Sequence, residues 1–385
     1  MANEETVALV LAGGGARGAY EIGALSALLP ALEREGRRPK LVIGTSVGAL
    51  NAAFLGATAD RPVDAVVAEG GRIWREIRYR DVLSPLLGIR EARRIGAYVG
   101  EVLGLPFNAT SLLDPAPLAG TLASAIPFDD LRRNAVAGRA HTAVVATAAA
   151  TSRTVVFHTN GPSPDADETR GIDYVRADLG VEHVMASAAI PVAFPAVSVT
   201  TPKGAGGWYF DGGTRLNAPI KPALSLGADR VIVLGVNSVA ARTPSGDARQ
   251  PDVADGAGQL LQAVLVDPLI NDVNSLAHDN REAGRRTIPY VFVAPPTPDA
   301  VGRLAADTFN EHYRGVRGLV RSRDVTLLGR AVSGGRDPDH GELLSYLFFA
   351  PEFTSALADL GRTDADRWLS ERHDDGIWQL TAPRP

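Results

Sequence analysis

The first 60 residues contain the same arrangement twice: a short aliphatic strand, a turn with glycine, and an apolar helix. The strand predicted over Thr6–Ala12 runs directly into Gly13-Gly14-Gly15, and leucines and isoleucines at helical spacing follow. Leu41-Val42-Ile43 is a second short strand, which ends at a glycine before an alanine-rich helix over Val47–Ala59. Two strand–turn–helix units in succession predict an α/β fold built on a parallel sheet.

The rest of the chain carries fewer but similar signals. Further strands are predicted at His141–Thr147, Thr154–His158, Val231–Val236 and Tyr290–Val293. Residues 61–130 are expected to form helices and loops over the sheet, and residues 240–258 a loop. We therefore expect one large α/β unit over residues 5–295 and a mainly helical extension over residues 296–385 that packs on it.

Composition excludes several classes of protein. The 385 residues include no cysteine, which removes disulfides, thiolate nucleophiles and zinc–cysteine sites. A formal net charge of −5 argues against nucleic-acid binding by neutralisation of phosphates. The N-terminus, Met-Ala-Asn-Glu-Glu, is acidic, unlike the basic start of a signal peptide, and no apolar run reaches the ~18 residues of a membrane span. These features predict a cytoplasmic globular protein.

The first of three chemical motifs is the loop Gly13-Gly14-Gly15-Ala16-Arg17-Gly18, between the first strand and its helix. Such a loop directs successive backbone N–H groups to one point near the positive end of a helix, which suits an anion. The same glycines match G-x-G-x-x-G, with Glu33 and Glu35 as candidate ribose ligands. The loop alone leaves both a dinucleotide site and an empty tight turn open.

The second motif, Gly44-Thr45-Ser46-Val47-Gly48, lies between the second strand and the second helix. It matches the G-x-S-x-G nucleophile elbow, in which small neighbours permit a strained turn that exposes the serine hydroxyl. A chance match in a glycine-rich chain is the competing interpretation. The strand–turn–helix context favours Ser46 as a nucleophile.

The third motif is Asp211-Gly212-Gly213, which follows Trp208-Tyr209-Phe210. Asp-Gly is primarily a turn signal, but a neutral serine needs a base to accept its proton, and a carboxylate can serve. Histidine is the more usual base, and His183 is the least easily dismissed of the seven histidines. Spacing alone therefore leaves a triad open.

In this order, the three motifs resemble those of the patatin-like phospholipases. The segment Ala186–Pro195 and Asn217-Ala218-Pro219 also look like that family, so that the resemblance covers about residues 7–221. It implies a three-layer fold with a mainly parallel central sheet flanked by helices, plus a C-terminal helical extension.

The resemblance also implies chemistry. Ser46 is then the nucleophile and Asp211 its base, without histidine, and the N–H groups around Gly14, Gly15 and Ala16 form the oxyanion hole. The neighbours Gly13, Arg17 and Gly18 belong to the same loop, Gly44, Thr45, Val47 and Gly48 to the elbow, and Gly212 and Gly213 to the turn beside the base. Arg17 would either add positive charge or support the loop by hydrogen bonds. No cofactor or metal is expected.

The activity so implied is hydrolysis of phospholipid or other lipid esters, with peripheral contact at a membrane. Trp74, Leu86-Leu87 and Phe107 are candidates for an acyl pocket or lid, and Tyr346–Phe349 for lipid contact, against ordinary core packing. Two alternatives remain: a nucleotide-binding oxidoreductase that uses Gly13, Gly15 and Gly18, and a catalytically weak lipid-binding or regulatory protein of the same fold.

Overall fold

The computed structural model describes residues 5–86, 111–240, 256, 267–282, 284, 286–332 and 341–381. Its strands are β1 (Val7–Leu11), β2 (Leu41–Thr45), β3 (His141–Ala148), β4 (Thr154–His158), β5 (Ile172–Arg176), β6 (Val197–Val199), β7 (Gly207–Asp211), β8 (Arg230–Leu234) and β9 (Tyr290–Val293). They form one sheet in the order β5-β4-β3-β2-β1-β8-β9, with β7 paired to β3 and β6 paired to β7.

The centre of the sheet is parallel, as the N-terminal repeats predict. β1 lies between β2 and β8 and is parallel to both, and β8 is parallel to β9. β3 is parallel to β2 but antiparallel to β4 and β7. The carboxyl ends of β1 and β2 therefore meet at one edge, where the glycine loop and the serine turn follow them.

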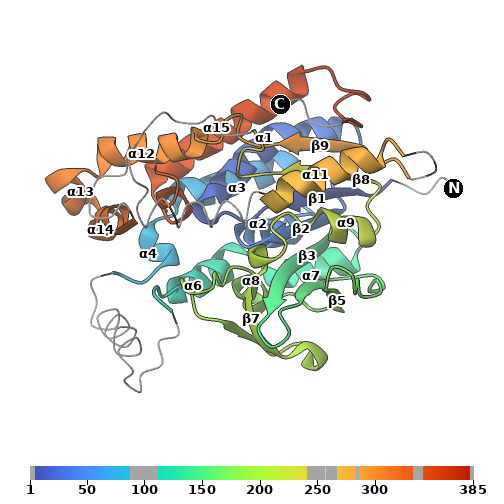
Figure 1. Ribbon diagram of the computed structural model, residues 1–385, viewed down its shortest axis with the longest axis horizontal. Helices are drawn as coiled ribbons and strands as arrows, with labels where there is room; N and C mark the ends of the chain where they lie inside the picture. The colour runs from blue at the N-terminus through green and yellow to red at the C-terminus, as the bar shows by residue number, and fades with distance from the viewer. Residues whose placement is uncertain are drawn as a thin grey trace.

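Helices cover both faces of the sheet (Figure 1). They are α1 (Gly18–Arg34), α2 (Val47–Ala57), α3 (Val63–Glu76), α4 (Tyr79–Val82), α6 (Ala116–Ala125), α7 (Phe128–Val136), α8 (Val181–Ser187), α9 (Ile220–Ser225), α11 (Asp267–Asp279), α12 (Ala300–His312), α13 (Gly315–Arg321), α14 (Arg323–Val332) and α15 (Pro351–Ser370). The described residues also form four short 3-10 helices, which are η1 (Gly15–Arg17), η2 (Lys203–Ala205), η3 (Gly212–Thr214) and η4 (Leu344–Tyr346).

Side-chain alternation in β1 explains the three layers. Leu9 and Leu11 belong to the core cluster under α1, α2 and α3, whereas Ala8 and Val10 belong to the cluster under α9 and α11. A strand buried on both faces needs apolar residues at every position, so its sequence shows no polar alternation. The predicted α/β class and three-layer arrangement are confirmed.

The predicted strand positions hold to within one or two residues, but three strands were not predicted. Trp208-Tyr209-Phe210 lies in β7, and its short partner β6 and the edge strand β5 carry mixed sequences. Edge and hairpin strands are exposed on one side, so they lack the continuous apolar run that identified the central strands. Most of the loop predicted over residues 240–258 lies outside the described residues.

The C-terminal helix α15 packs along α1, and the backbones of the two helices approach each other closely (Figure 1). A Cβ added to Gly361 would lie 2.1 Å from the carbonyl oxygen of Tyr20, and one added to Gly23 would lie 1.9 Å from that of Ala358. The two helices can approach this closely only because each presents glycine to the other. The boundary predicted at residue 295 remains a prediction.

Gly361→Ala is expected to lower the free energy of unfolding by about 2 kcal/mol or more, because the new methyl group overlaps α1. Gly120→Ala is the matched control, since Gly120 also lies inside a helix but has nothing within 4 Å of an added Cβ. That variant should gain up to about 1 kcal/mol. Urea unfolding measures both, and equal shifts would refute the close approach of α1 and α15.

Candidate active site

Ser46 occupies a strained turn between β2 and α2. Its backbone has φ 55° and ψ −123°, and its side chain is 6 % exposed. A positive φ is uncommon for a residue other than glycine and is a frequent feature of functional sites. This is the geometry that the G-x-S-x-G pattern predicts.

The glycines on either side of Ser46 are required by close packing. A Cβ on Gly44 would lie 2.1 Å from the carbonyl oxygen of Gly48, and one on Gly48 would lie 2.3 Å from that of Leu11. Both positions must lack a side chain for the turn to sit against the end of β1. The chance-match interpretation of this motif is therefore disfavoured.

Asp211 ends β7 and lies beside Ser46. The Ser46 hydroxyl hydrogen-bonds to the Asp211 carboxyl, and the backbone N–H of Gly213 donates to Asp211 Oδ1 at 2.7 Å. The side chain is 4 % exposed, and burial raises the pKa of Asp211 to about 7 although these two hydrogen bonds favour the charged form. A carboxyl group with this pKa can exchange a proton near neutral pH.

Two further side chains hold the motifs in place. Ser187 of α8 accepts a hydrogen bond from the Ser46 backbone N–H (2.9 Å) and donates one to the carbonyl of Val145 (2.5 Å). Asn217 Oδ1 accepts one from the backbone N–H of Gly13 (3.0 Å). Both residues lie in the two segments that resemble the family, but their contacts join parts of the chain 141 and 204 residues apart. Sequence reasoning assigned them no role.

Three backbone N–H groups of the glycine loop are available to bind an anion. Those of Gly13, Arg17 and Gly18 donate to backbone carbonyls or to Asn217. Within the described part of the chain, those of Gly14, Gly15 and Ala16 donate to no acceptor. Because a Cβ on Gly13 would lie 3.1 Å from Ser46 Cβ, the loop runs directly past the serine.

Arg17 is held by the C-terminal extension. Its side chain is 1 % exposed, and Nη2 lies 2.7 Å from Glu342 Oε1 and 2.6 Å from Ser345 Oγ. Nε also donates to Ser345 Oγ at 2.9 Å, Nη1 donates to Asn237 Oδ1, and the guanidinium lies 4.0 Å from the centre of the Tyr346 ring. These contacts occupy all three guanidinium nitrogens.

The same extension also touches the loop backbone. Gly15 has φ +59°, and a Cβ there would lie 2.1 Å from the carbonyl oxygen of Tyr346. The loop thus requires glycine at this position both for its backbone conformation and for its contact with η4. A segment about 330 residues later in the chain therefore fixes the shape of the glycine loop.

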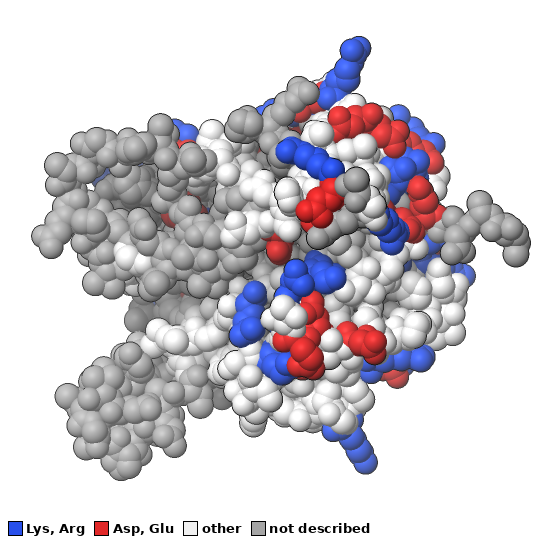
Figure 2. Space-filling view, turned by 45° about the vertical axis from the view of Figure 1, so that its right-hand side comes forward, with Lys and Arg blue, Asp and Glu red and all other residues white. Residues whose placement is uncertain are grey.

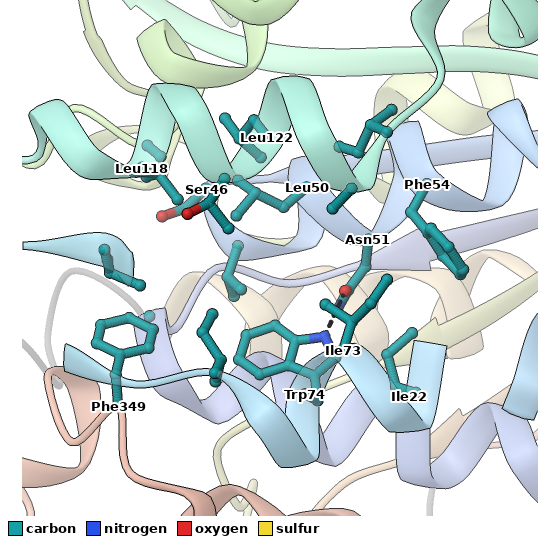
Figure 3. A pocket seen from close by; sticks show the side chains of 18 of the residues that line it. Ile22, Ser46, Leu50, Asn51, Phe54, Ile73, Trp74, Leu118, Leu122 and Phe349 are labelled. Atoms are coloured by element: carbon teal, nitrogen blue, oxygen red, sulfur yellow. Dashed lines mark hydrogen bonds between the residues drawn. The ribbon is translucent and has the colours of Figure 1, made fainter. Parts of the chain in front are cut away.

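An apolar cavity extends from Ser46 between α2, α3 and α6 (Figure 3). In Figure 3, Ser46 and Phe349 lie toward one end and Phe54 and Ile22 toward the other, with Leu50, Ile73, Trp74 and Leu122 between them. The cavity has a volume of about 80 Å³. Trp74, which the sequence suggested for an acyl pocket, lines this cavity. Of the segment suggested for lipid contact, Tyr346, Leu347 and Phe349 also line the cavity, whereas Phe348 is in the core. Leu86 packs against the core, and Leu87 and Phe107 lie outside the described residues.

The polar side chains of Asn51, Trp74 and Thr121 in the cavity wall are bonded to the protein itself. Asn51 Oδ1 accepts from Trp74 Nε1 (3.0 Å), and Asn51 Nδ2 donates to Gly18 O (3.1 Å) and to Glu21 Oε2 (2.7 Å). Thr121 Oγ1 donates to the carbonyl of Asp81 at 2.5 Å. The wall thus presents an apolar surface to a ligand, which suits an alkyl chain.

His183 is engaged away from the serine. Its Nδ1 accepts from the backbone N–H of Gly180 (3.1 Å), and Nε2 contacts the carbonyl of Thr201 (2.7 Å). Burial lowers the pKa of His183, which favours the neutral ring. Of the histidines that the structure describes, none is bonded to Ser46 or Asp211.

A dinucleotide site fits this geometry poorly. Glu33 and Glu35 lie at the C-terminal end of α1, about 25 Å along the helix from the glycine loop. They pair there with Arg38 and Arg37. Neither glutamate can reach a ribose whose phosphates lie at that loop. Across the described ranges, no group of three or more His, Cys, Asp or Glu is arranged to hold a metal ion.

Comparison with known proteins adds a family. The family model for patatin-like phospholipases matches residues 9–224. The solved structures that match this chain include VipD from Legionella pneumophila (14 % identity over 89 % of this chain and 67 % of that chain, TM-score 0.32). Another is the human GIVD cytosolic phospholipase A2 with a methyl gamma-linolenyl fluorophosphonate inhibitor (12 % identity over 94 % of this chain and 60 % of that chain, TM-score 0.32). No curated protein is significantly similar in sequence.

Proposed function

Because the chain belongs to the patatin-like phospholipase family, a family of lipid hydrolases, we propose that it cleaves lipid carboxylic esters through an acyl-serine at Ser46. The observation that carries this proposal is the hydrogen bond from the Ser46 hydroxyl to the buried Asp211 carboxyl, at one end of an apolar cavity. A nucleophile, a base and a site for an acyl chain thus lie together. Phospholipids and lysophospholipids are the substrate class that we expect.

In the first half of the reaction, Ser46 Oγ attacks the ester carbonyl while its proton passes to Asp211. The tetrahedral intermediate then collapses, the C–O bond to the alcohol breaks, and Asp211 returns the proton to the leaving oxygen. In the second half, Asp211 accepts a proton from water, whose oxygen attacks the acyl-serine. The fatty acid leaves, and Ser46 recovers its proton.

The oxyanion of the intermediate is expected to bind the N–H groups of Gly14, Gly15 and Ala16. These amides donate to no other group in the described part of the loop, which runs past Ser46. A preorganised donor of this kind contributes about 3 kcal/mol to the transition state. We assign Arg17 the supporting role, since its guanidinium nitrogens are all bonded to Asn237, Glu342 and Ser345.

A fluorophosphonate probe tests the proposed nucleophile directly. We expect the probe to label the folded protein stoichiometrically, and mass spectrometry of the peptides to place the adduct on Ser46. Labelling should disappear when the protein is first unfolded in urea, because the elbow and its base then separate. An adduct on another residue, or none, would overturn the proposal and leave the catalytically weak lipid-binding alternative.

The far end of the cavity predicts how chain length is limited. From Ser46 to Phe54, α2 advances by about 12 Å, which is the length of an extended alkyl chain of roughly ten carbons. Gly70 of α3 lines the cavity near this end, where an added Cβ would lie 3.1 Å from Phe54 Cε1 and 3.4 Å from Ile22 Cγ2. A side chain at Gly70 would therefore crowd Phe54 and Ile22 and narrow this end of the cavity.

Gly70→Ala and Gly70→Val are expected to shift the preferred ester progressively toward shorter chains. We expect kcat/KM for a long-chain ester to fall by about tenfold in Gly70→Val, and kcat/KM for an acetate ester to stay unchanged. The reason is that each methylene of the acyl chain that is no longer buried costs ~0.8 kcal/mol of binding free energy. Gly71→Ala is the control, since Gly71 is the next residue in α3 but does not line the cavity. A series of p-nitrophenyl esters measures the effect, and an equal loss at every chain length would contradict it.

A further inference from the structure

Helix α13 presents an apolar surface to solvent. Val316, Leu319 and Val320 are 78, 37 and 83 % exposed, and their spacing places them on one side of the helix. The opposite side packs against α14, since Gly318 is buried and a Cβ there would lie 2.7 Å from Thr326 Oγ1. We call Val316, Leu319 and Val320, with the exposed Arg317 and Arg323, the α13 surface.

The segment that forms this surface is rich in arginine. Residues 314–323 read Arg-Gly-Val-Arg-Gly-Leu-Val-Arg-Ser-Arg, with four arginines and no acidic residue, in a chain whose net charge is −5. Arg321 is bound to Glu352, but Arg317 and Arg323 form no ion pair with any described residue. On the face shown in Figure 2, by contrast, basic and acidic side chains are interspersed.

Aromatic packing connects α13 to the wall of the cavity. Tyr313, which precedes α13, contacts the ring of Phe348 with centroids 5.4 Å apart. The neighbours of Phe348, Leu347 and Phe349, line the cavity that extends from Ser46. At the other end, Asp324 of α14 accepts a hydrogen bond from the backbone N–H of Leu86 (2.7 Å), close to the cavity residue Val82. In Figure 1, α13 lies at the outer end of the molecule beside α12 and α14.

We propose that the α13 surface binds the headgroup region of an anionic lipid bilayer. Apolar side chains with arginines beside them match the layered chemistry of that region: the valines and leucine enter the acyl boundary, and the guanidinium groups remain with the phosphates. None of the described helices combines the length and the apolar character needed to cross a bilayer. Binding through the α13 surface would bring the bilayer close to the cavity wall at residues 347–349. The proposal rests on the proposed function only in that the ester substrate belongs to the same bilayer.

Vesicle sedimentation tests the surface independently of catalysis. We expect the full-length protein to bind vesicles of phosphatidylcholine mixed with phosphatidylglycerol, and to bind vesicles of phosphatidylcholine alone much more weakly. Arg317→Glu/Arg323→Glu should weaken binding to the anionic vesicles by about tenfold or more, and high salt should do the same. Val316→Ser/Val320→Ser should weaken binding to a similar extent, because less apolar surface is buried in the bilayer.

Matched variants on other surfaces serve as controls. Arg139→Glu/Arg372→Glu changes the net charge equally at exposed positions, and Val136→Ser removes a valine that is 78 % exposed on α7. Both should bind like the unchanged protein. Equal binding by the α13 variants and these controls would overturn the proposal. A protein that binds no vesicle at all would also overturn it, in favour of an acidic protein surface as the partner.

The two proposals can fail separately. Hydrolysis of a water-soluble short-chain ester by the α13 variants reports on the site at Ser46 without any vesicle. We expect that rate to be unchanged. If the unchanged protein does not hydrolyse this ester, the result counts against the proposed function. The role of the α13 surface is decided by vesicle binding alone.

Discussion

Ser46→Ala is expected to reduce kcat for ester hydrolysis by about 10⁴-fold or more and to abolish fluorophosphonate labelling. The acyl-enzyme route needs the hydroxyl as nucleophile, and the remaining oxyanion donors and cavity can provide only residual catalysis. Binding of a fatty acid in the cavity should change little, because the apolar wall is intact. Single-turnover kinetics with a p-nitrophenyl ester and titration with a fluorescent fatty acid measure the two effects.

The matched control for this change is Ser370→Ala, at an exposed serine near the end of α15. It should hydrolyse the ester like the unchanged protein. Comparable rates for Ser46→Ala and Ser370→Ala would show that Ser46 is not the nucleophile. The hydrogen bond between Ser46 and Asp211 would then be a structural contact only.

Asp211→Asn is expected to have the second-largest effect, a loss in kcat/KM of about 10³-fold or more, because the amide cannot accept the serine proton. In the unchanged protein, kcat/KM should rise with pH and level off above about 7, where the Asp211 carboxyl is ionised. The variant should show no such rise. Asp129→Asn, at an exposed carboxylate on α7, is the control and should keep both the rate and the pH profile.

Asp211→Asn is expected to lower activity but not the free energy of unfolding, because the buried Asp211 carboxyl is itself a cost to the folded protein at neutral pH. Burial raises the pKa of Asp211 from 3.8 to about 7, so the folded protein holds a proton that the unfolded chain releases. The stability from this group is therefore complete below pH 4, is lost as the pH rises to about 7, and stays low above that. At one pKa unit per 1.36 kcal/mol, the loss is on the order of 4 kcal/mol.

Asn carries no charge at any of these pH values, so Asp211→Asn should be at least as stable as the unchanged protein above pH 7. Urea unfolding at pH 5 and pH 8 would measure the difference. A variant that loses activity together with several kcal/mol of stability at pH 8 would indicate that Asp211 holds the turn rather than acting as a base.

Most of the core could be predicted from the sequence because its signals are local. A strand buried on both faces must be apolar throughout, and a turn such as that at Ser46 must have glycines beside it. Both requirements are met within a few residues of the chain. The edge strands β5 and β6 escaped prediction because a partly exposed strand imposes no such pattern.

The support of the glycine loop could not be predicted in the same way. Arg17 was open to two interpretations in the sequence, as a positive charge for the oxyanion or as a support for the loop. Its contacts with Glu342 and Ser345 depend on how α15 places the preceding segment against α1. Because these partners lie more than 300 residues away in the chain, no local pattern records them.

By itself, the sequence determined the α/β class, the parallel centre of the sheet and Ser46 as the candidate nucleophile, since glycine turns and aliphatic strands impose strict local requirements. The pairing of Ser46 with Asp211 came from the resemblance to the family, because spacing alone left a histidine base open. Only the tertiary structure decided that Asp211 rather than His183 contacts the serine, and that the acyl cavity lies between α2, α3 and α6. The physical reason is that a pKa, a cavity or a bonded arginine depends on side chains that the fold brings together from distant parts of the chain.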